Sequence, residues 1–244
     1  MDPLTSAAAA GLQANMDSFD MLANNMANAS TSGFKADREF YSSYLAPEAD
    51  DLMNPSVGVS PIVQKQWTDF AQGTLQTTGN ATDLALSGAG FFAVNGPNGT
   101  LYTRGGNFHF NSQGVLASAD GYPVRLDNGK TLQTQSTGPL QVGVDGEVSQ
   151  DGIPLGKLQV TNFVDPTLLT RKAGTYFENQ DPQANPQSAS NAEVQQGKTE
   201  TSNGAPAETA ARMISLMRHF EMLQHAIKLG SDMNRSAVEE VAKV

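Results

Sequence analysis

Apolar residues with helical spacing occur at both ends of this chain, separated by a long middle region without that pattern. The first stripe consists of Ala8, Leu12, Phe19, Leu22 and Met26. The second, spaced alternately by three and four, consists of Met213, Leu216, Phe220, Leu223 and Ile227. A helix with one such stripe is marginal alone in water, because its apolar face needs a partner. The two stripes therefore predict terminal helices that pair with each other as a coiled coil.

The middle of the chain has the signature of an antiparallel β structure. From about residue 84, short apolar segments alternate with Asn-Gly and Asp-Gly dipeptides, the strongest short-range signal for hairpins. A strand about every ten residues is typical of sandwiches and barrels. We therefore expect an α+β fold that is mainly β, with a sandwich or barrel-like centre between the helices.

These patterns divide the chain into five predicted parts. They are an N-terminal helix (1–35), a connector (36–80), a central β domain (81–178), a polar return segment that is extended or flexible (179–206) and a C-terminal helix (207–244). Trp67, the single tryptophan, is predicted to lie in a core, where most lone tryptophans are found.

Composition and charge exclude several kinds of partner. The net charge is −10 and no cluster of lysines and arginines occurs, which argues against nucleic acid. Without cysteine, the chain has neither disulfides nor thiolate sites. The N-terminus lacks the basic region and apolar core of a cleaved signal peptide, and no run approaches the roughly 18 apolar residues that a membrane span needs.

Residues capable of catalysis are few and badly spaced for it. His219 and His225 are six positions apart, whereas two metal ligands on one helix face are four apart. Asp145, Glu147 and Asp151 lie close in sequence, but in predicted turns. We expect no enzyme activity, no metal and no cofactor.

The segment NNMANASTSGFK, residues 24–35, ends the first helical stripe with residues that favour a helix cap and a turn. This segment resembles the signature of flagellar rod and hook axial proteins. Three further stretches resemble other blocks of that family, in the same order: TTGNATDLALSGAGFF (77–92), YTRGGNF (102–108) and MISLMRHFEM (213–222). Four ordered motifs make the resemblance specific.

The resemblance implies a rod subunit that polymerises through its terminal helices into a hollow, torque-transmitting shaft. It favours the proximal over the distal rod, with a distal rod or hook-like subunit as the alternative. The implied partners are copies of itself, other rod and hook proteins and the flagellar type III export apparatus, and the implied location is the periplasm-spanning rod. The positions expected at subunit contacts are Leu12, Phe19, Leu22, Asn25, Met26, Asn28, Thr31, Gly33, Phe34, Met213, Leu216, Phe220, Leu223 and Ile227.

Two expectations about these positions are specific enough to be tested by geometry. The asparagines of the signature are expected to face other subunits, as are the helix faces outside the stripes. Gly33→Val and Asn28→Leu are expected to block assembly while the β domain stays folded. A different class of function, a soluble β-domain binding module with ligands at loops 95–100 or 126–130, remains open at this point.

Overall fold

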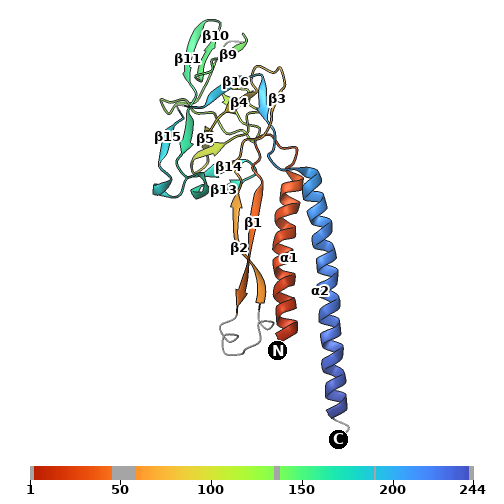
Figure 1. The fold of residues 1–244 in the computed structure, drawn as a ribbon. Helices are drawn as coiled ribbons and strands as arrows, with labels where there is room; N and C mark the ends of the chain where they lie inside the picture. Colours follow the sequence, from red (N-terminus) through yellow and green to blue (C-terminus); the bar gives the residue numbers. More distant parts are fainter. Residues whose placement is uncertain (1–2, 46–58, 135–137, 190, 242–244) are drawn as a thin grey trace. The chain divides into compact units, whose positions relative to one another are not determined.

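The computed structural model describes residues 3–45, 59–134, 138–189 and 191–241 (Figure 1). The chain forms two compact units, each assembled from separate parts of the sequence. The helical unit comprises residues 1–27, 37–68 and 205–244, and the β unit comprises residues 28–36 and 69–204. The chain therefore passes from the helical unit into the β unit, back again, and then once more in each direction.

The helical unit contains the two predicted terminal helices. Helix α1 spans Pro3–Ala27 and helix α2 spans Pro206–Val241. They lie side by side and run in opposite directions (Figure 1). The proline that opens α2 fits its place, because the first turn of a helix has no hydrogen bond for that amide to make. The prediction of helices at both ends is confirmed.

The third element of the helical unit is an antiparallel ribbon formed by the predicted connector. Strand β1 (Asp37–Leu45) pairs with β2 (Val59–Thr68), and both contact α1. The expectation that only other subunits cover the remaining helix faces is therefore wrong for α1. The prediction that Trp67 lies in a core is also wrong: it is 40% exposed on β2. The reason is that α1 covers only one face of a two-stranded ribbon.

The β unit is organised around one six-stranded antiparallel sheet. Its strand order is β13-β14-β6-β5-β12-β15. The strands are β5 (Phe91–Gly96), β6 (Gly99–Thr103), β12 (Val160–Phe163), β13 (Thr170–Ala173), β14 (Tyr176–Glu178) and β15 (Pro186–Ser188). A short 3-10 helix, η2 (Pro166–Leu168), joins β12 to β13.

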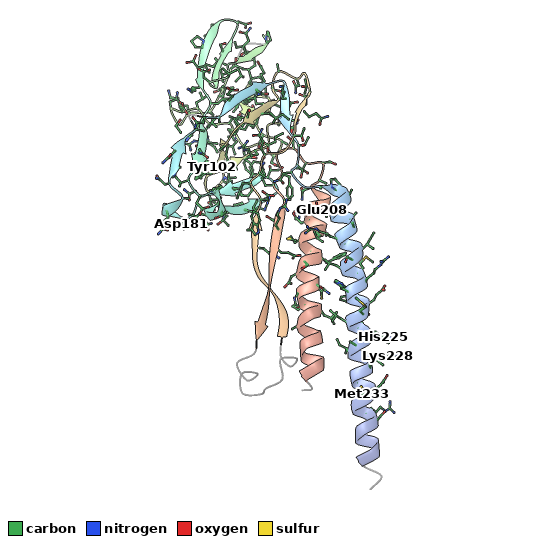
Figure 2. All side chains as sticks on the ribbon, in the orientation of Figure 1. Tyr102, Asp181, Glu208, His225, Lys228 and Met233 are labelled. Carbon is green, nitrogen blue, oxygen red and sulfur yellow. The ribbon has the colours of Figure 1, made fainter. Side chains whose placement is uncertain are left out.

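Both faces of this sheet are buried at its centre. Along β5, Phe92 and Val94 belong to one apolar cluster, and Phe91 and Ala93 belong to a second. Tyr102 on β6 joins the second cluster and lies within the β unit (Figure 2). Successive side chains of a strand point to opposite faces, so a continuous apolar run indicates a strand covered on both sides.

Smaller antiparallel sheets complete the β unit. They are β3 (Leu75–Thr77) with β17 (Lys198–Glu200), β4 (Leu84–Ser87) with β16 (Glu193–Gln196), β7 (His109–Phe110) with β8 (Leu116–Ala117), and the three strands β9 (Leu140–Val142), β10 (Glu147–Gln150) and β11 (Ile153–Lys157). The antiparallel prediction is confirmed, but the strands described here form no closed barrel.

The predicted polar return segment contains more structure than its composition suggested. Residues 179–206 include the 3-10 helix η3 (Pro182–Ala184) and strands β15, β16 and β17. Each strand pairs with a strand from earlier in the chain. Backbone hydrogen bonds do not depend on apolar side chains, so a polar sequence can pair wherever a free strand edge accepts it.

The predicted hairpin turns are present where Asp-Gly dipeptides occur. Asp151 and Gly152, with φ of 53° and 78°, form the two-residue connection between β10 and β11. A turn with positive φ at both positions matches the right-handed twist of the strands, and Asp-Gly suits it. This geometry supports the prediction that Asp151 lies in a turn.

Candidate assembly surface

The paired faces of α1 and α2 are made by the residues of the two predicted stripes. On α2, Met213, Leu216, Phe220, Leu223 and Ile227 are half-buried. On α1, Leu12, Phe19 and Met26 are half-buried and Leu22 is buried. A Cβ placed on Gly11 would lie 3.3 Å from Leu223 Cδ1, so the α1 backbone lies close against the Leu223 side chain. The two stripes lie on one interface within the chain.

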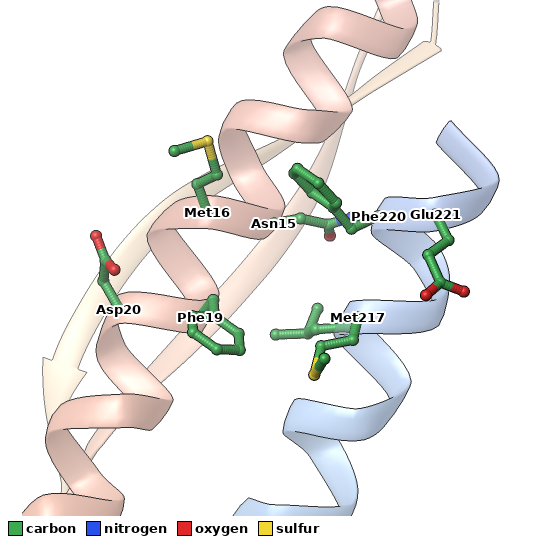
Figure 3. Close-up of a pocket in the computed structure, with 8 residues that line it drawn as sticks. Asn15, Met16, Phe19, Asp20, Met217, Phe220 and Glu221 are labelled. Atoms are coloured by element: carbon green, nitrogen blue, oxygen red, sulfur yellow. The ribbon is translucent and has the colours of Figure 1, made fainter. Parts of the chain in front are cut away.

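An apolar groove runs between the two helices at their middle (Figure 3). Its volume is about 330 Å³, and it is open to solvent. Its walls are formed by Asn15, Met16, Phe19, Asp20, Leu216, Met217, Phe220 and Glu221. Asn15 occupies the place in the α1 stripe where an apolar residue is missing, between Leu12 and Phe19. The groove therefore lies at the interruption of the seam.

Several large apolar side chains of α2 are exposed to solvent. They are Ile214, Met217, Met222, Leu229 and Met233, which are between 52% and 72% exposed. Met233 lies near His225 and Lys228 along the same helix (Figure 2). Isolated exposed apolar residues are common, but five on one helix form an apolar surface of the kind that marks protein contacts.

A second face of α1 is buried by residues that the stripe did not include. Ala14, Ser18, Met21 and Asn25 are all buried, with spacings of four, three and four. The Ser18 hydroxyl donates to the Ala14 carbonyl at 2.9 Å. Since β1 and β2 are the other neighbours of α1 in this unit, this face packs on the ribbon. Small and polar side chains gave no apolar signal in the sequence.

Asn25 joins α1 to the start of β1. Its Nδ2 donates to the Asp37 carbonyl at 2.7 Å, and its Oδ1 accepts from the Asp37 amide at 2.9 Å. The side chain is 5% exposed. The expectation that Asn25 faces another subunit is therefore wrong: both ends of its amide pair with this chain's own backbone.

The rest of the signature belongs to the β unit. The Asn28 carbonyl accepts from the Thr31 amide at 3.0 Å, and its side chain accepts from the Thr31 hydroxyl at 3.2 Å, which makes a local turn. Gly33, with φ of 69°, donates its amide to the Glu200 carbonyl at 2.7 Å. Phe34 is 1% exposed and stacks against the Arg171 guanidinium, 4.9 Å from the ring centre.

Gly33 cannot carry a side chain in this position. A Cβ there would lie 2.1 Å from the Gly105 amide nitrogen and 2.2 Å from the Arg104 carbonyl carbon. Both are backbone atoms, which cannot turn aside as a side chain could. We therefore expect Gly33→Val to destabilise the β unit itself, in contrast to the expectation drawn from the sequence that this unit stays folded.

A buried ion network lies directly behind the signature. Lys35 Nζ lies 2.5 Å from Glu200 Oε1, and Arg104 Nη1 lies 3.1 Å from Glu200 Oε2. Lys35 and Glu200 are fully buried, and Arg104 is 5% exposed. Lys35 also donates to the Ala71 carbonyl at 2.7 Å, and Glu200 Oε1 accepts from the Gly73 amide at 2.9 Å.

The pKa values of the two cations reflect a balance of opposing effects. Burial lowers the pKa of Lys35 below its ordinary value, and the carboxylate of Glu200 opposes that shift. Burial likewise lowers the pKa of Arg104, again opposed by Glu200. A buried cation without a counter-charge is strongly unfavourable, so Glu200 is the main counter-charge for both, with a weaker contribution from Asp69 to Lys35. Sequence analysis assigned no role to Glu200, a single acid in a polar segment.

Groups that could support catalysis or metal binding are dispersed. All three histidines are exposed. Within the described ranges, no group of three or more histidine and acidic side chains could hold a metal ion. Among those same residues, no helix is long and apolar enough to cross a membrane.

Comparisons with known proteins agree with this arrangement. Residues 85–150 match the family described as "Flagellar hook protein FlgE/F/G D1 domain", and residues 195–240 match "Flagellar basal body rod FlgEFG protein C-terminal". The flagellar basal-body rod protein FlgF of Caulobacter vibrioides is 34% identical over 230 residues, which cover 92% of each chain. FlgG of Buchnera aphidicola subsp. Baizongia pistaciae is 28% identical and covers 96% of this chain and 97% of its own.

Paired terminal helices in one unit and a largely antiparallel β unit, together with the two family matches, place the chain among the structural subunits of the flagellar axis. The extent of the match to the Caulobacter protein makes the assignment specific. The chain belongs to the family of flagellar basal-body rod proteins.

Proposed function

We propose that this subunit polymerises through α1 and α2 into the hollow shaft of the rod. The observation that carries the proposal is the groove between the helices, together with the exposed apolar side chains of α2. One chain alone leaves these surfaces in water, whereas neighbours in a tube would cover them. A tube of close-packed helices deforms little, which suits the transmission of torque.

The pairing of the two helices within a subunit is proposed to be a coiled coil. The α2 stripe carries the alternating spacing of three and four that such a seam requires, and the α1 stripe carries it except for one gap of seven between Leu12 and Phe19. Leu12, Leu22, Met26 and the α2 stripe would fill the seam. Phe19 and Phe220 would form the floor of the groove, where Asn15 interrupts the apolar series.

The occupant proposed for the groove is a terminal helix of a neighbouring axial subunit. Asp20 and Glu221 border the apolar floor, one on each helix. This charge favours a large apolar side chain flanked by lysine or arginine on the incoming helix. Such a match would fix the register between neighbours as well as their affinity.

The family resemblance supports finer features of the same proposal. The subunit passes through the flagellar type III export apparatus without a cleaved signal peptide. It lies in the basal body, in the part of the rod that spans the periplasm, with copies of itself and other rod and hook proteins as partners. Its place is the proximal rather than the distal rod, and it acts without enzyme activity or cofactor.

The proposal is tested by a pair of substitutions on α2. Met217 is 55% exposed and lines the groove, so Met217→Glu is expected to abolish rod assembly and motility while the helical content of the purified chain is unchanged. Ser215, exposed on the same helix and outside the groove, provides the control Ser215→Glu. Electron cryo-microscopy of isolated basal bodies would locate the subunit. Normal rods with Met217→Glu, or a diffuse periplasmic location of the native protein, would contradict the proposal.

A further inference from the structure

The β unit begins and ends at one place. Its first segment, residues 28–36, lies against its last, residues 198–204. Gly33 donates its amide to the Glu200 carbonyl, and the Ser32 hydroxyl donates to the same carbonyl at 3.0 Å. The Ala36 amide donates to Asn203 Oδ1 at 2.8 Å. These contacts join parts of the chain that are more than 160 residues apart.

Glu200 connects more of the β unit than these two segments. Its carboxylate accepts from Lys35, Arg104 and the Gly73 amide. Through one fully buried residue, four separate parts of the chain are joined: residues 28–36, the segment before β3, the end of β6 and β17. Each of these three donors precedes Glu200 by about a hundred positions or more, a separation that makes the contacts entirely non-local.

The central sheet depends on the same carboxylate. Arg104 follows directly after β6, and its guanidinium also donates to the Gly88 carbonyl at 2.6 Å, just before β5. Without Glu200, Lys35 and Arg104 would both be buried cations lacking their partner. Removing one member of a buried ion pair is strongly destabilising, because the remaining charge stays out of water.

We propose that Glu200 is the closing latch of the β unit, so that the unit becomes stable only when its last strand has joined its first segment. A chain that emerges from its N-terminus lacks the main counter-charge of Lys35, and the counter-charge of Arg104, until the residues just before α2 are present. The β unit therefore stays open over most of its length and closes in one step. The latch concerns the folding of this unit and does not depend on how the subunit assembles.

The latch predicts a particular pattern of amide hydrogen exchange in the full-length protein. The amides of Gly33 and Gly73 both donate to Glu200, so they report directly on the latch. They are expected to exchange with the same opening free energy as the core amides of Leu84 and Ala93, because all four open together. Exchange of Gly33 and Gly73 that is much faster than that of the core would overturn the proposal.

A substitution provides the second arm of the test. Glu200→Gln keeps the shape but removes the charge, and it is expected to speed exchange of the core amides by about 100-fold or more. Glu193→Gln, on an exposed carboxylate of β16, is the matched control and is expected to leave exchange unchanged. Failure of the Glu200→Gln variant to fold where the control folds also supports the latch. An effect confined to Gly33 and Gly73, with the core unchanged, would refute it.

Discussion

Gly33 and Gly105, from two separate segments of the β unit, approach so closely that a Cβ on Gly33 would lie 2.1 Å from the Gly105 nitrogen. The close approach is possible because Gly33 has no side chain and a φ of 69°. The absence of a side chain at Gly33 lets this part of the signature pack directly against Arg104 and Gly105, which follow β6. This contact explains why glycine occupies the position without appeal to any partner.

Gly33→Ala is expected to destabilise the β unit by more than about 4 kcal/mol, since it combines backbone strain with a backbone clash that cannot relax locally. Gly79→Ala is the matched control, because Gly79 has a similar φ of 76° and nothing within 4 Å of its added Cβ. That substitution is expected to cost about 1–3 kcal/mol, from strain alone. Urea unfolding, together with hydrogen exchange of the amides in β4–β6, measures the loss of stability in both variants. Equal losses in the two variants would show that the clash at Gly33 is relieved.

Asn25→Ala is expected to lower the stability of the helical unit by about 1–3 kcal/mol, because it leaves the half-buried amide and carbonyl of Asp37 without the Asn25 side chain that pairs with them. The most direct readout is the exchange rate of the Asp37 amide, which donates to Asn25 Oδ1. Gln224→Ala, at an exposed position of α2, is the control for a polar residue truncated on a helix surface. Unchanged protection of the Asp37 amide in Asn25→Ala would contradict the role given to this side chain.

The buried hydroxyl of Tyr176 leads us to expect that the protein loses stability at alkaline pH. Its hydroxyl donates to Ser118 Oγ at 2.8 Å, and burial raises the pKa of Tyr176 well above the ordinary 10.0. The unfolded chain therefore releases this proton first. The protonated Tyr176 hydroxyl makes its full contribution to the free energy of unfolding below pH 10. This contribution is lost as the pH rises above 10, because deprotonation then favours the unfolded state.

Phenylalanine substitutions isolate this effect. Tyr176→Phe is expected to lower stability at neutral pH by about 1 kcal/mol through the lost hydrogen bond, and to reduce the decline above pH 10. Tyr122→Phe keeps Tyr176 and removes only the smallest of the contributions to its raised pKa, so it should keep most of the decline of the native chain. Urea titrations at several alkaline pH values give the free energy of unfolding of each variant as a function of pH. An equal decline in both variants would rule out Tyr176 as the source of the loss of stability at alkaline pH.

The sequence predicted those parts of the structure whose signal is local or periodic. A stripe of apolar residues spaced by three and four directly records which face of a helix is covered, so Leu216 and Phe220 were found together with their partner helix. The Asp-Gly turn at Asp151 is likewise a local property, because the two residues supply the positive φ that the turn needs.

Other features had no local signal to detect. The second buried face of α1 is made by Ala14, Ser18, Met21 and Asn25, and three of these four residues are small or polar. The Lys35–Glu200 pair joins positions 165 residues apart, so neither residue differs in its own neighbourhood from a solvated surface charge. Only the folded topology, which places β17 beside residues 28–36, reveals that they are buried.

The stripe on α2 provides the last prediction, which separates pairing within a subunit from contacts between subunits. Leu216 is half-buried on the seam with α1, whereas Leu229 is 52% exposed on the same helix. Leu216→Ala is expected to lower the stability of the helix pair by about 1–2 kcal/mol, because part of a leucine side chain leaves an apolar environment. Leu229→Ala is expected to change it by less than about 0.5 kcal/mol. Thermal melting of the helical circular dichroism signal of the isolated full chain measures both, and equally small effects would show that α1 and α2 pair only after assembly.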